Sequence, residues 1–357
     1  MSQNWMRHFE LLLVNEKGQA TDFGTFKVTF TIDWFNTSQN TAVGTFKIYN
    51  LSADTVKRIS GQEFTRIQVI AGYDGLAPTV DVSQVGIART VNPDEVGQTD
   101  GRNYGQIFGG EIRYTIEGKD NPVDSYVLIQ AADTDRAFST TITSQTLAAG
   151  YRASDVDKLL MRDFQANGAT NGRTAPMPDT VFPRGRVLFG MTRNLMDNVA
   201  AQCGATWMFV NGKREMVAKN EVVHDAIALN SETGLIGMPQ QTFGNGVNVR
   251  CLINPNIQVN GLIELNQKTA FINRAQLSNN DIAMAGGRVT TETSNGNTTV
   301  SGTTAQPASI ATDGVYVVRG IMYTGDTRGQ AWYMDLICEA RGAQDLRTQS
   351  SLERGAG

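Results

Sequence analysis

The strongest constraint on the fold of this chain is a run of strict two-residue alternation near its N-terminus. In FKVTFTIDW, apolar side chains occupy every second position from Phe26 to Trp34, and mostly polar side chains lie between them. Successive residues of a strand point to opposite sides of a sheet, so the pattern predicts a strand with one buried face. Further strands are predicted in TFKIYNL, RIQVIAGY, QIFGGEIRYTI and SYVLIQAAD. A short helix capped by Ser52 interrupts them, which predicts a small antiparallel barrel or sandwich closed by one helix.

The middle of the chain changes to helical spacing. ASDVDKLLMRDFQANG repeats apolar residues at three and four positions, with Ser154 as the predicted N-cap, and TRNLMDNVAAQCG forms a second amphipathic segment. In TWMFVNGKREMVAK, Asn211–Gly212 separates two strand-like runs. Asn-Gly suits a two-residue hairpin turn because both residues tolerate positive φ. These elements predict a compact α/β insert.

The last third returns to strands, in VNVRCLI, IQVNGLIEL, GVYVVRGIMY and AWYMDLICEA. Two polar segments with few large apolar side chains are predicted to lie outside any core, Val80–Gly105 as a surface insertion and Met284–Gly314 as a long mobile loop. The expected organisation is a mainly β chain with a first barrel at 1–138 (insertion 80–105), an α/β insert at 139–230, a second barrel at 231–342 (loop 284–314) and a polar tail at 343–357.

Composition narrows the function classes. The net charge is −4 and there is no block of Lys or Arg, whereas tight nucleic-acid binders carry a basic stripe. Three widely spaced cysteines, Cys203, Cys251 and Cys338, argue against a disulfide framework and for assembly in a reducing cytoplasm. No apolar run approaches the ~18 residues of a membrane span, and the N-terminus has no secretory signal pattern.

The candidate chemical motifs are weak. Gly244 and Gly246 form a GNG, but a strand pattern follows them and the third glycine of a dinucleotide fingerprint is missing. The two histidines, His8 and His224, stand apart from any cysteine or carboxylate cluster, which disfavours triads and zinc sites. We predict glycines that bend the chain into a strand, and two surface or capped histidines.

Carboxylates and aromatic residues have structural explanations as well. The candidates are Asp54, Asp133, Asp135, Asp155, Asp157, Trp207, Phe209, Trp332 and Tyr333. Acidic residues in a first helical turn, such as Asp155 and Asp157, stabilise the helix dipole. Aromatic residues in alternating strands are more often core or interface residues than stacking platforms for bases or sugars. The sequence therefore predicts no catalytic residue, no cofactor site and no metal site.

Four stretches, in this order, carry a resemblance to a known family: FKIYNLSADTVKRI, NLMDNVAAQCGATWMFVNGKREMVAK, ETGLIGMPQQTFGNGVNVRCLINPNIQVNGLIEL and VYVVRGIMYTGDTRGQAWYMDLICEA. Together they cover a little over a quarter of the chain, spread along its length. They resemble the central baseplate hub protein of contractile-tailed bacteriophages, whose barrels are shared with tail-tube subunits and the base of type VI secretion spikes. One departure is Tyr323, which stands where related hubs often have histidine.

The resemblance implies a homotrimer in which two tube-like barrels per chain form a pseudo-sixfold ring. Such a ring joins a threefold central spike to a sixfold tail tube or tube-initiator protein, contacts the surrounding baseplate proteins, and lets DNA pass its lumen without specific binding. It implies a virion protein assembled in the bacterial host cytoplasm. Three alternatives stay open: another tube-like tail protein (distal tail or tube initiator), a cell-wall-degrading tail enzyme with paired carboxylates, and an adhesin or carbohydrate-binding β-protein.

Overall fold

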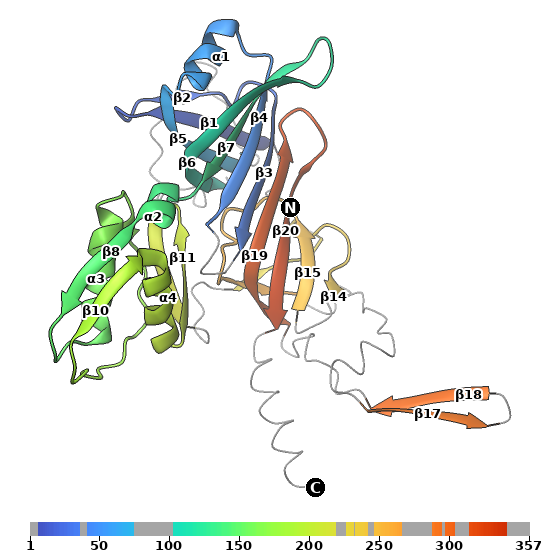
Figure 1. Cartoon of the computed structure of the whole chain (residues 1–357). Coiled ribbons are helices and arrows are strands. Elements are labelled where there is room, and N and C mark those ends of the chain that lie inside the picture. The colour runs from blue at the N-terminus through green and yellow to red at the C-terminus, as the bar shows by residue number, and fades with distance from the viewer. Residues whose placement is uncertain are drawn as a thin grey trace.

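The computed structural model of the chain describes residues 6–35, 41–74, 103–218, 226–231, 233–241, 246–265, 288–294, 297–303 and 314–340. Within them the fold is mainly β with a small helical part, as the sequence predicts. Figure 1 shows a strand-rich body built from both ends of the chain, with the helix-bearing insert beside it.

The N-terminal part of the body contains β1 (Arg7–Asn15), β2 (Ala20–Asp22), β3 (Val28–Phe35), β4 (Val43–Tyr49), α1 (Ala53–Ser60), β5 (Phe64–Tyr73), β6 (Asn103–Lys119) and β7 (Ser125–Ala132). The insert contains α2 (Asp135–Thr140), β8 (Ile142–Leu147), α3 (Ala153–Gln165), β9 (Thr170–Asn171), β10 (Arg186–Met191), α4 (Thr192–Gln202), β11 (Ala205–Val210) and β12 (Lys213–Ala218). The C-terminal part contains β13 (Ala226–Ala228), β14 (Gln240–Gln241), β15 (Gly246–Cys251), β16 (Leu262–Glu264), β17 (Arg288–Ser294), β18 (Asn297–Thr303), β19 (Val315–Asp326) and β20 (Trp332–Ala340).

The two strand-rich regions are joined edge to edge in one sheet. The order of its main path is β14-β15-β20-β19-β3-β4-β7-β6-β5-β1-β2, and β13 and β16 attach to it through β19. The junction is the antiparallel pair β3–β19, in which Asp326 faces Thr29 at one end and Gly320 faces Phe35 at the other. The regions that the sequence presents as two barrels are thus hydrogen-bonded to each other as one continuous sheet.

An aromatic cluster fills the core beneath this junction. Phe9 stacks on Phe30 with ring centroids 5.3 Å apart, and Trp332 meets both rings edge-on at 5.9 and 5.7 Å. Gly325, which pairs with Phe30 across the strands, leaves room for the Phe30 ring, because a Cβ built on it would lie 2.3 Å from that ring. A single buried cluster therefore extends through both strand-rich regions.

Local signals set the helices and turns. The Ser52 hydroxyl accepts the Thr55 N–H at 3.3 Å, which confirms the predicted cap of α1. The predicted cap of α3 is wrong: the helix begins at Ala153, one residue before Ser154, and the Asp155 carboxylate accepts the Arg152 N–H at 2.9 Å. A carboxylate in the first turn can satisfy an orphan backbone donor as well as a cap hydroxyl does.

The insert has its own core, in which α3 and α4 pack on the β11–β12 hairpin. Asn211 and Gly212 adopt φ of 50° and 84°, which confirms the predicted hairpin turn. Arg214 and Asp157 form an ion pair of 3.2 Å inside this core, with Arg214 only 1% exposed. Burial of both charges raises the cost of removing either one alone.

One buried carboxylate fastens the insert to the body. Asp133, directly after β7, accepts the Gly212 N–H at 2.9 Å and the Thr134 hydroxyl at 2.8 Å through the same oxygen, Oδ1. Its other oxygen, Oδ2, is buried without a hydrogen-bond partner. Desolvation raises the pKa of Asp133 to about 7, although the hydrogen bonds from Thr134, Gly212 and Asn211 oppose this shift.

The polar segment 284–314 differs from the loop that the sequence predicts. Within it, β17 and β18 pair in antiparallel register, from Arg288 with Thr303 to Ser294 with Asn297. The segment is rich in threonine, and β-branched residues favour extended pairing without a large apolar face. Its predicted mobility stays a prediction. The predicted insertion Val80–Gly105 lies outside the described residues up to 102, and the tail 343–357 lies wholly outside them.

We expect Gly325→Ala to destabilise the protein by about 1–3 kcal/mol, the usual cost of overpacking a core. Alanine suits the extended backbone there, so the penalty comes from the contact with Phe30. The free energy of unfolding is measured in urea, with Thr324→Ala on the solvent side of β19 as the control. In a Phe30→Leu background the penalty should shrink; an equal penalty in both backgrounds would contradict the assigned contact.

Asp133 predicts a pH dependence of stability. Its pKa is about 7 in the folded protein, whereas the ordinary value of an aspartate, which applies in the unfolded chain, is 3.8. The folded state therefore binds the proton more tightly, and this residue lowers stability progressively as pH rises from about 4 to about 7, with no further change above.

Asp133→Asn keeps an oxygen for the Gly212 N–H but does not ionise. We expect its stability relative to the natural protein to increase across that window, measured by denaturant unfolding at several pH values. Asp133→Ala, which loses the hydrogen bond, should be less stable than Asp133→Asn throughout. A pH-independent difference between the natural protein and Asp133→Asn would refute the assignment.

Candidate functional site on the outer face of the sheet

The face of the sheet that points away from the core carries a continuous row of polar side chains. Along β3, buried Phe30 and Ile32 alternate with exposed Thr31. The strand register aligns equivalent positions of six strands, in the order Tyr333, Thr324, Thr31, Thr45, Gln130 and Tyr114. We call this set the threonine row. It crosses the β3–β19 junction and presents hydroxyl and amide groups without a charge.

A neighbouring row contains one paired cation and a further carboxylate. Arg250, Asp335, Met322 and Asp33 are successive cross-strand partners on β15, β20, β19 and β3. Arg250 binds Asp335 through two nitrogens, at 2.7 and 3.0 Å, and lies 4.3 Å from the centre of the Tyr333 ring. Partial burial raises the pKa of the Asp33 carboxyl.

On the other side of the threonine row, Lys47 is likewise paired with a carboxylate and placed over a tyrosine ring. Its ammonium lies 3.2 Å from Asp120 and 4.3 Å from the centre of the Tyr126 ring. Lys47 and Arg250, which flank the threonine row, are therefore each neutralised by a carboxylate. A surface without free cations gains little from phosphate contacts, because counterion release by Lys and Arg supplies most non-specific DNA affinity.

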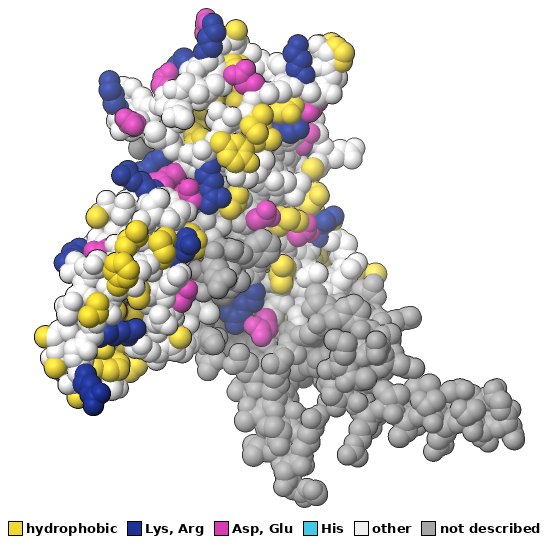
Figure 2. Space-filling model, viewed as in Figure 1, with side chains coloured by type: hydrophobic (Ala, Val, Ile, Leu, Met, Phe, Trp, Pro, Cys, Tyr) yellow, Lys and Arg dark blue, Asp and Glu magenta, His cyan; other side chains and the backbone are white. Residues whose placement is uncertain are grey.

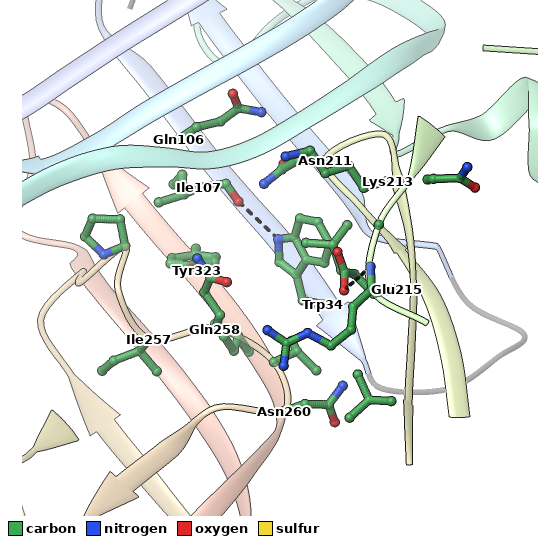
Figure 3. Close-up of a pocket in the computed structure, with 18 residues that line it drawn as sticks. Trp34, Gln106, Ile107, Asn211, Lys213, Glu215, Ile257, Gln258, Asn260 and Tyr323 are labelled. Carbon is green, nitrogen blue, oxygen red and sulfur yellow. Dashed lines mark hydrogen bonds between the residues drawn. The ribbon is translucent and has the colours of Figure 1, made fainter. Parts of the chain in front are cut away.

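A cavity of about 370 Å³ lies where the insert meets the body. Figure 3 shows Trp34, Gln106 and Tyr323 of the body facing Asn211 and Glu215 of the insert across it. The Trp34 indole donates to the Ile107 carbonyl at 3.2 Å, and Glu215 accepts the Arg173 N–H at 3.1 Å. Among its described lining residues Glu215 is the one carboxylate, so it has no pair for glycoside hydrolysis.

Each carboxylate that the sequence offered as a candidate has a separate structural role. Asp54 is in the first turn of α1, and Asp133 fastens the insert. Asp135 pairs with Arg113, Asp155 satisfies the start of α3, and Asp157 pairs with Arg214. In the part of the chain that the structure describes, no three His, Cys, Asp or Glu side chains come together as a metal site would require.

His8 is an ion-paired residue at the start of β1. Its two ring nitrogens lie 2.9 Å from Asp74 and 2.9 Å from Glu10, and its ring stacks on Tyr104 at 3.8 Å. Desolvation lowers the pKa of His8, but the hydrogen bonds and charges of Asp74 and Glu10 outweigh it and raise the pKa to about 9. His224 lies outside the described residues.

The remaining candidates are packing residues. Trp207 and Phe209 lie in the core of the insert, and Trp332 lies beneath the sheet junction, so these three are core residues as predicted. Tyr333 belongs to the threonine row instead. Gly246 opens β15, and Gly244 lies outside the described residues.

The three cysteines are free thiols, and burial raises the pKa of each. Tyr323, the position of the departure from related hubs, is fully buried against the cavity, and burial raises the pKa of its phenol. Neither the three thiols nor the Tyr323 phenol therefore belongs to the polar rows of the outer face.

Sequence reasoning did not find the outer rows, although part of the signal is visible. Thr29, Thr31 and Asp33 alternate with the apolar residues of β3, and Thr45 and Lys47 do so in β4. The alignment of these residues with Thr324 and Met322 depends on the pairing of β3 with β19, which no local pattern specifies.

None of the helices in the described ranges is long and apolar enough to cross a membrane.

Comparison with known proteins finds likeness in structure alone. No family model and no curated protein matches the sequence. The structure is similar to the 43 kDa tail protein of prophage MuSo2 from Shewanella oneidensis, with a TM-score of 0.53 and 5% identity, over 94% of this chain and 98% of that one. It is also similar to the tail protein from Neisseria meningitidis MC58, with a TM-score of 0.51 and 8% identity, over 95% and 98%. Over nearly its whole length, the chain shares its fold with phage tail proteins.

Proposed function

We propose that this chain is the structural baseplate hub of a phage tail, which forms a trimeric pseudo-sixfold ring between the threefold central spike and the sixfold tail tube. The observation that carries the proposal is the continuous sheet built from two strand-rich regions of one chain, in a fold shared end to end with tail proteins. Two ring segments in each chain let three chains present six similar segments, which relates the two symmetries.

The ends of the sheet support assembly through strand edges. The path ends at β2, of three residues, and at β14, of two residues. An edge strand leaves backbone N–H and C=O groups unpaired, and a neighbouring chain can complete them. In a closed ring each such edge becomes an interface between copies instead of an aggregation site.

The outer face of the sheet is the part that we assign to the lumen. The threonine row offers DNA no charge, and Lys47 and Arg250 on either side of it are each paired with a carboxylate. Genomic DNA therefore passes without specific binding, which suits a conduit for genome ejection. The threonine row also argues against the alternative of a carbohydrate-binding adhesin, because its two aromatic residues, Tyr114 and Tyr333, lie at opposite ends of the row.

The same proposal assigns roles to the parts of the chain. Residues 1–138 and 231–342 form the two ring segments, 139–230 form the insert and 343–357 a tail. The partners are the central spike, the tail tube or its initiator, and the surrounding baseplate proteins, in a virion assembled in the host cytoplasm. The chain acts as a structural protein and not as an enzyme. Another tube-like tail protein is the second candidate, because the fold likeness applies to tail proteins in general.

Native mass measurement and electron-microscope images of the purified protein test the ring. We expect a mass of three chains and a ring with threefold symmetry around a central hole, since two joined segments per chain require three copies for six segments. A ring of six chains would favour a distal tail or tube-initiator protein. Hydrolysis of peptidoglycan by the pure protein would favour the cell-wall-degrading enzyme.

Introducing positive charge into the threonine row tests the assignment of the outer face to the lumen. We expect Thr31→Arg with Thr45→Arg to create salt-sensitive binding of double-stranded DNA that the natural protein lacks, and to slow DNA release from assembled particles. Each new phosphate contact adds about 0.9 to the slope of log affinity against log salt concentration. The control is Thr31→Gln with Thr45→Gln, which adds bulk without charge; equal slowing by both pairs would contradict an electrostatic cause.

A further inference from the structure

The two-stranded sheet β8–β10 exposes an apolar face. Ile142, Val187 and Phe189 are 62%, 70% and 76% exposed, although side chains of this size are normally buried. They share one face, because Phe189 pairs with Ser144, Val187 with Thr146 and Met191 with Ile142. The opposite face is buried in the insert, as Leu188 and Thr143 show at 1% and 0% exposure.

This face is also free at its edges. Neither β8 nor β10 pairs with a third strand among the described residues, so the small sheet has unpaired backbone groups on both sides. Figure 1 shows β8 and β10 on the side of the insert away from the body, whereas the β11–β12 turn meets the body through Asp133. The exposed face is therefore directed away from the body of its own chain.

Positive charge surrounds the face. Arg184 lies just before β10, and Arg186 begins the strand on the side of Leu188; neither takes part in an ion pair with any residue that the structure describes. Residues 139–218 contain nine basic and six acidic residues, while the whole chain has a net charge of −4. Figure 2 shows hydrophobic side chains gathered on the insert with Lys or Arg side chains next to them. The insert is thus a basic unit of an otherwise acidic chain.

We propose that this surface, the insert patch of Ile142, Val187 and Phe189 with Arg184 beside it, binds the strand-rich body of the next copy of this chain. The proposal rests on the ring described above. The body has the opposite charge to the insert. The chain has a net charge of −4 and the insert is basic, so the residues outside 139–218 have a net charge more negative than −4. Such a contact joins two different surfaces of identical chains, and a contact of this kind repeats around a closed ring. Apolar contact supplies affinity, and Arg184 supplies orientation and association rate.

The first test measures assembly. Val187→Ser with Phe189→Ser removes the apolar part of the patch from an exposed face, so folding should be unaffected. We expect the protein concentration at half-assembly to rise at least tenfold, measured by mass photometry over a dilution series. Val123→Ser is the matched control, because Val123 is 86% exposed at the β6–β7 turn and lies outside the patch. Arg184→Glu should weaken assembly most at low salt.

The second test identifies the surface that the patch contacts. The photoreactive residue p-benzoylphenylalanine is placed at position 189 of the purified full-length protein, and cross-linked peptides are mapped by mass spectrometry. We expect cross-links between two chains, from position 189 to residues 1–135 or 226–340. A cross-link to the insert of another copy, or one formed in assembled tails to a different tail protein, would overturn the proposal.

The two proposals fail in different ways. A natural ring that Val187→Ser with Phe189→Ser leaves intact at every concentration would overturn the insert patch and leave the hub proposal standing. A natural protein that never forms a ring would overturn both. Unchanged thermal unfolding of the double serine variant is the check that any loss of assembly comes from the surface.

Discussion

The pairing of β3 with β19 is the contact on which the rest of the structure depends. It joins segments about three hundred residues apart, from Thr29 facing Asp326 to Phe35 facing Gly320. The aromatic cluster of Phe9, Phe30 and Trp332 fills the space beneath it, and Gly325 makes that space available. Without this pair, each strand-rich region would have one more open edge and a smaller core, and the outer rows would not be continuous.

The same pairing divides the sheet into two chemically distinct faces. Because side chains alternate along each strand, the buried position of Phe30 and Ile32 fixes Thr31 on the opposite face. A slip of one residue would exchange the faces, so the packing of large aromatic residues also maintains the polar surface. The cations there are held over tyrosine rings and paired with carboxylates, as Arg250 is with Tyr333 and Asp335. The packing of the core and the polarity of the outer face thus depend on the same strand register.

Local signals in the sequence predicted local structure, and contacts between distant segments were beyond it. The alternation around Phe30, the cap at Ser52 and the turn at Asn211–Gly212 each act within a few residues, and all three are confirmed. The pairing β3–β19 could not be predicted, since many strands share the same periodicity and compete as partners. Asp133 resembles any turn aspartate until the insert covers it. The β17–β18 hairpin had a visible signal, Asn295–Gly296 between two threonine-rich runs, which low apolar content outweighed.

The position of the insert follows from how it is fastened, and this determines where its exposed face points. The turn at Gly212 binds Asp133 of the body, while Arg214, two residues further, binds Asp157 of α3. The β11–β12 hairpin is therefore held on one side by the body and on the other by the helices. The sheet β8–β10 covers the insert core through Leu188 and lies on the side of the insert away from the body (Figure 1). An exposed apolar face of this kind is typical of a binding surface, and the proposed ring of identical chains would supply a neighbour at every insert.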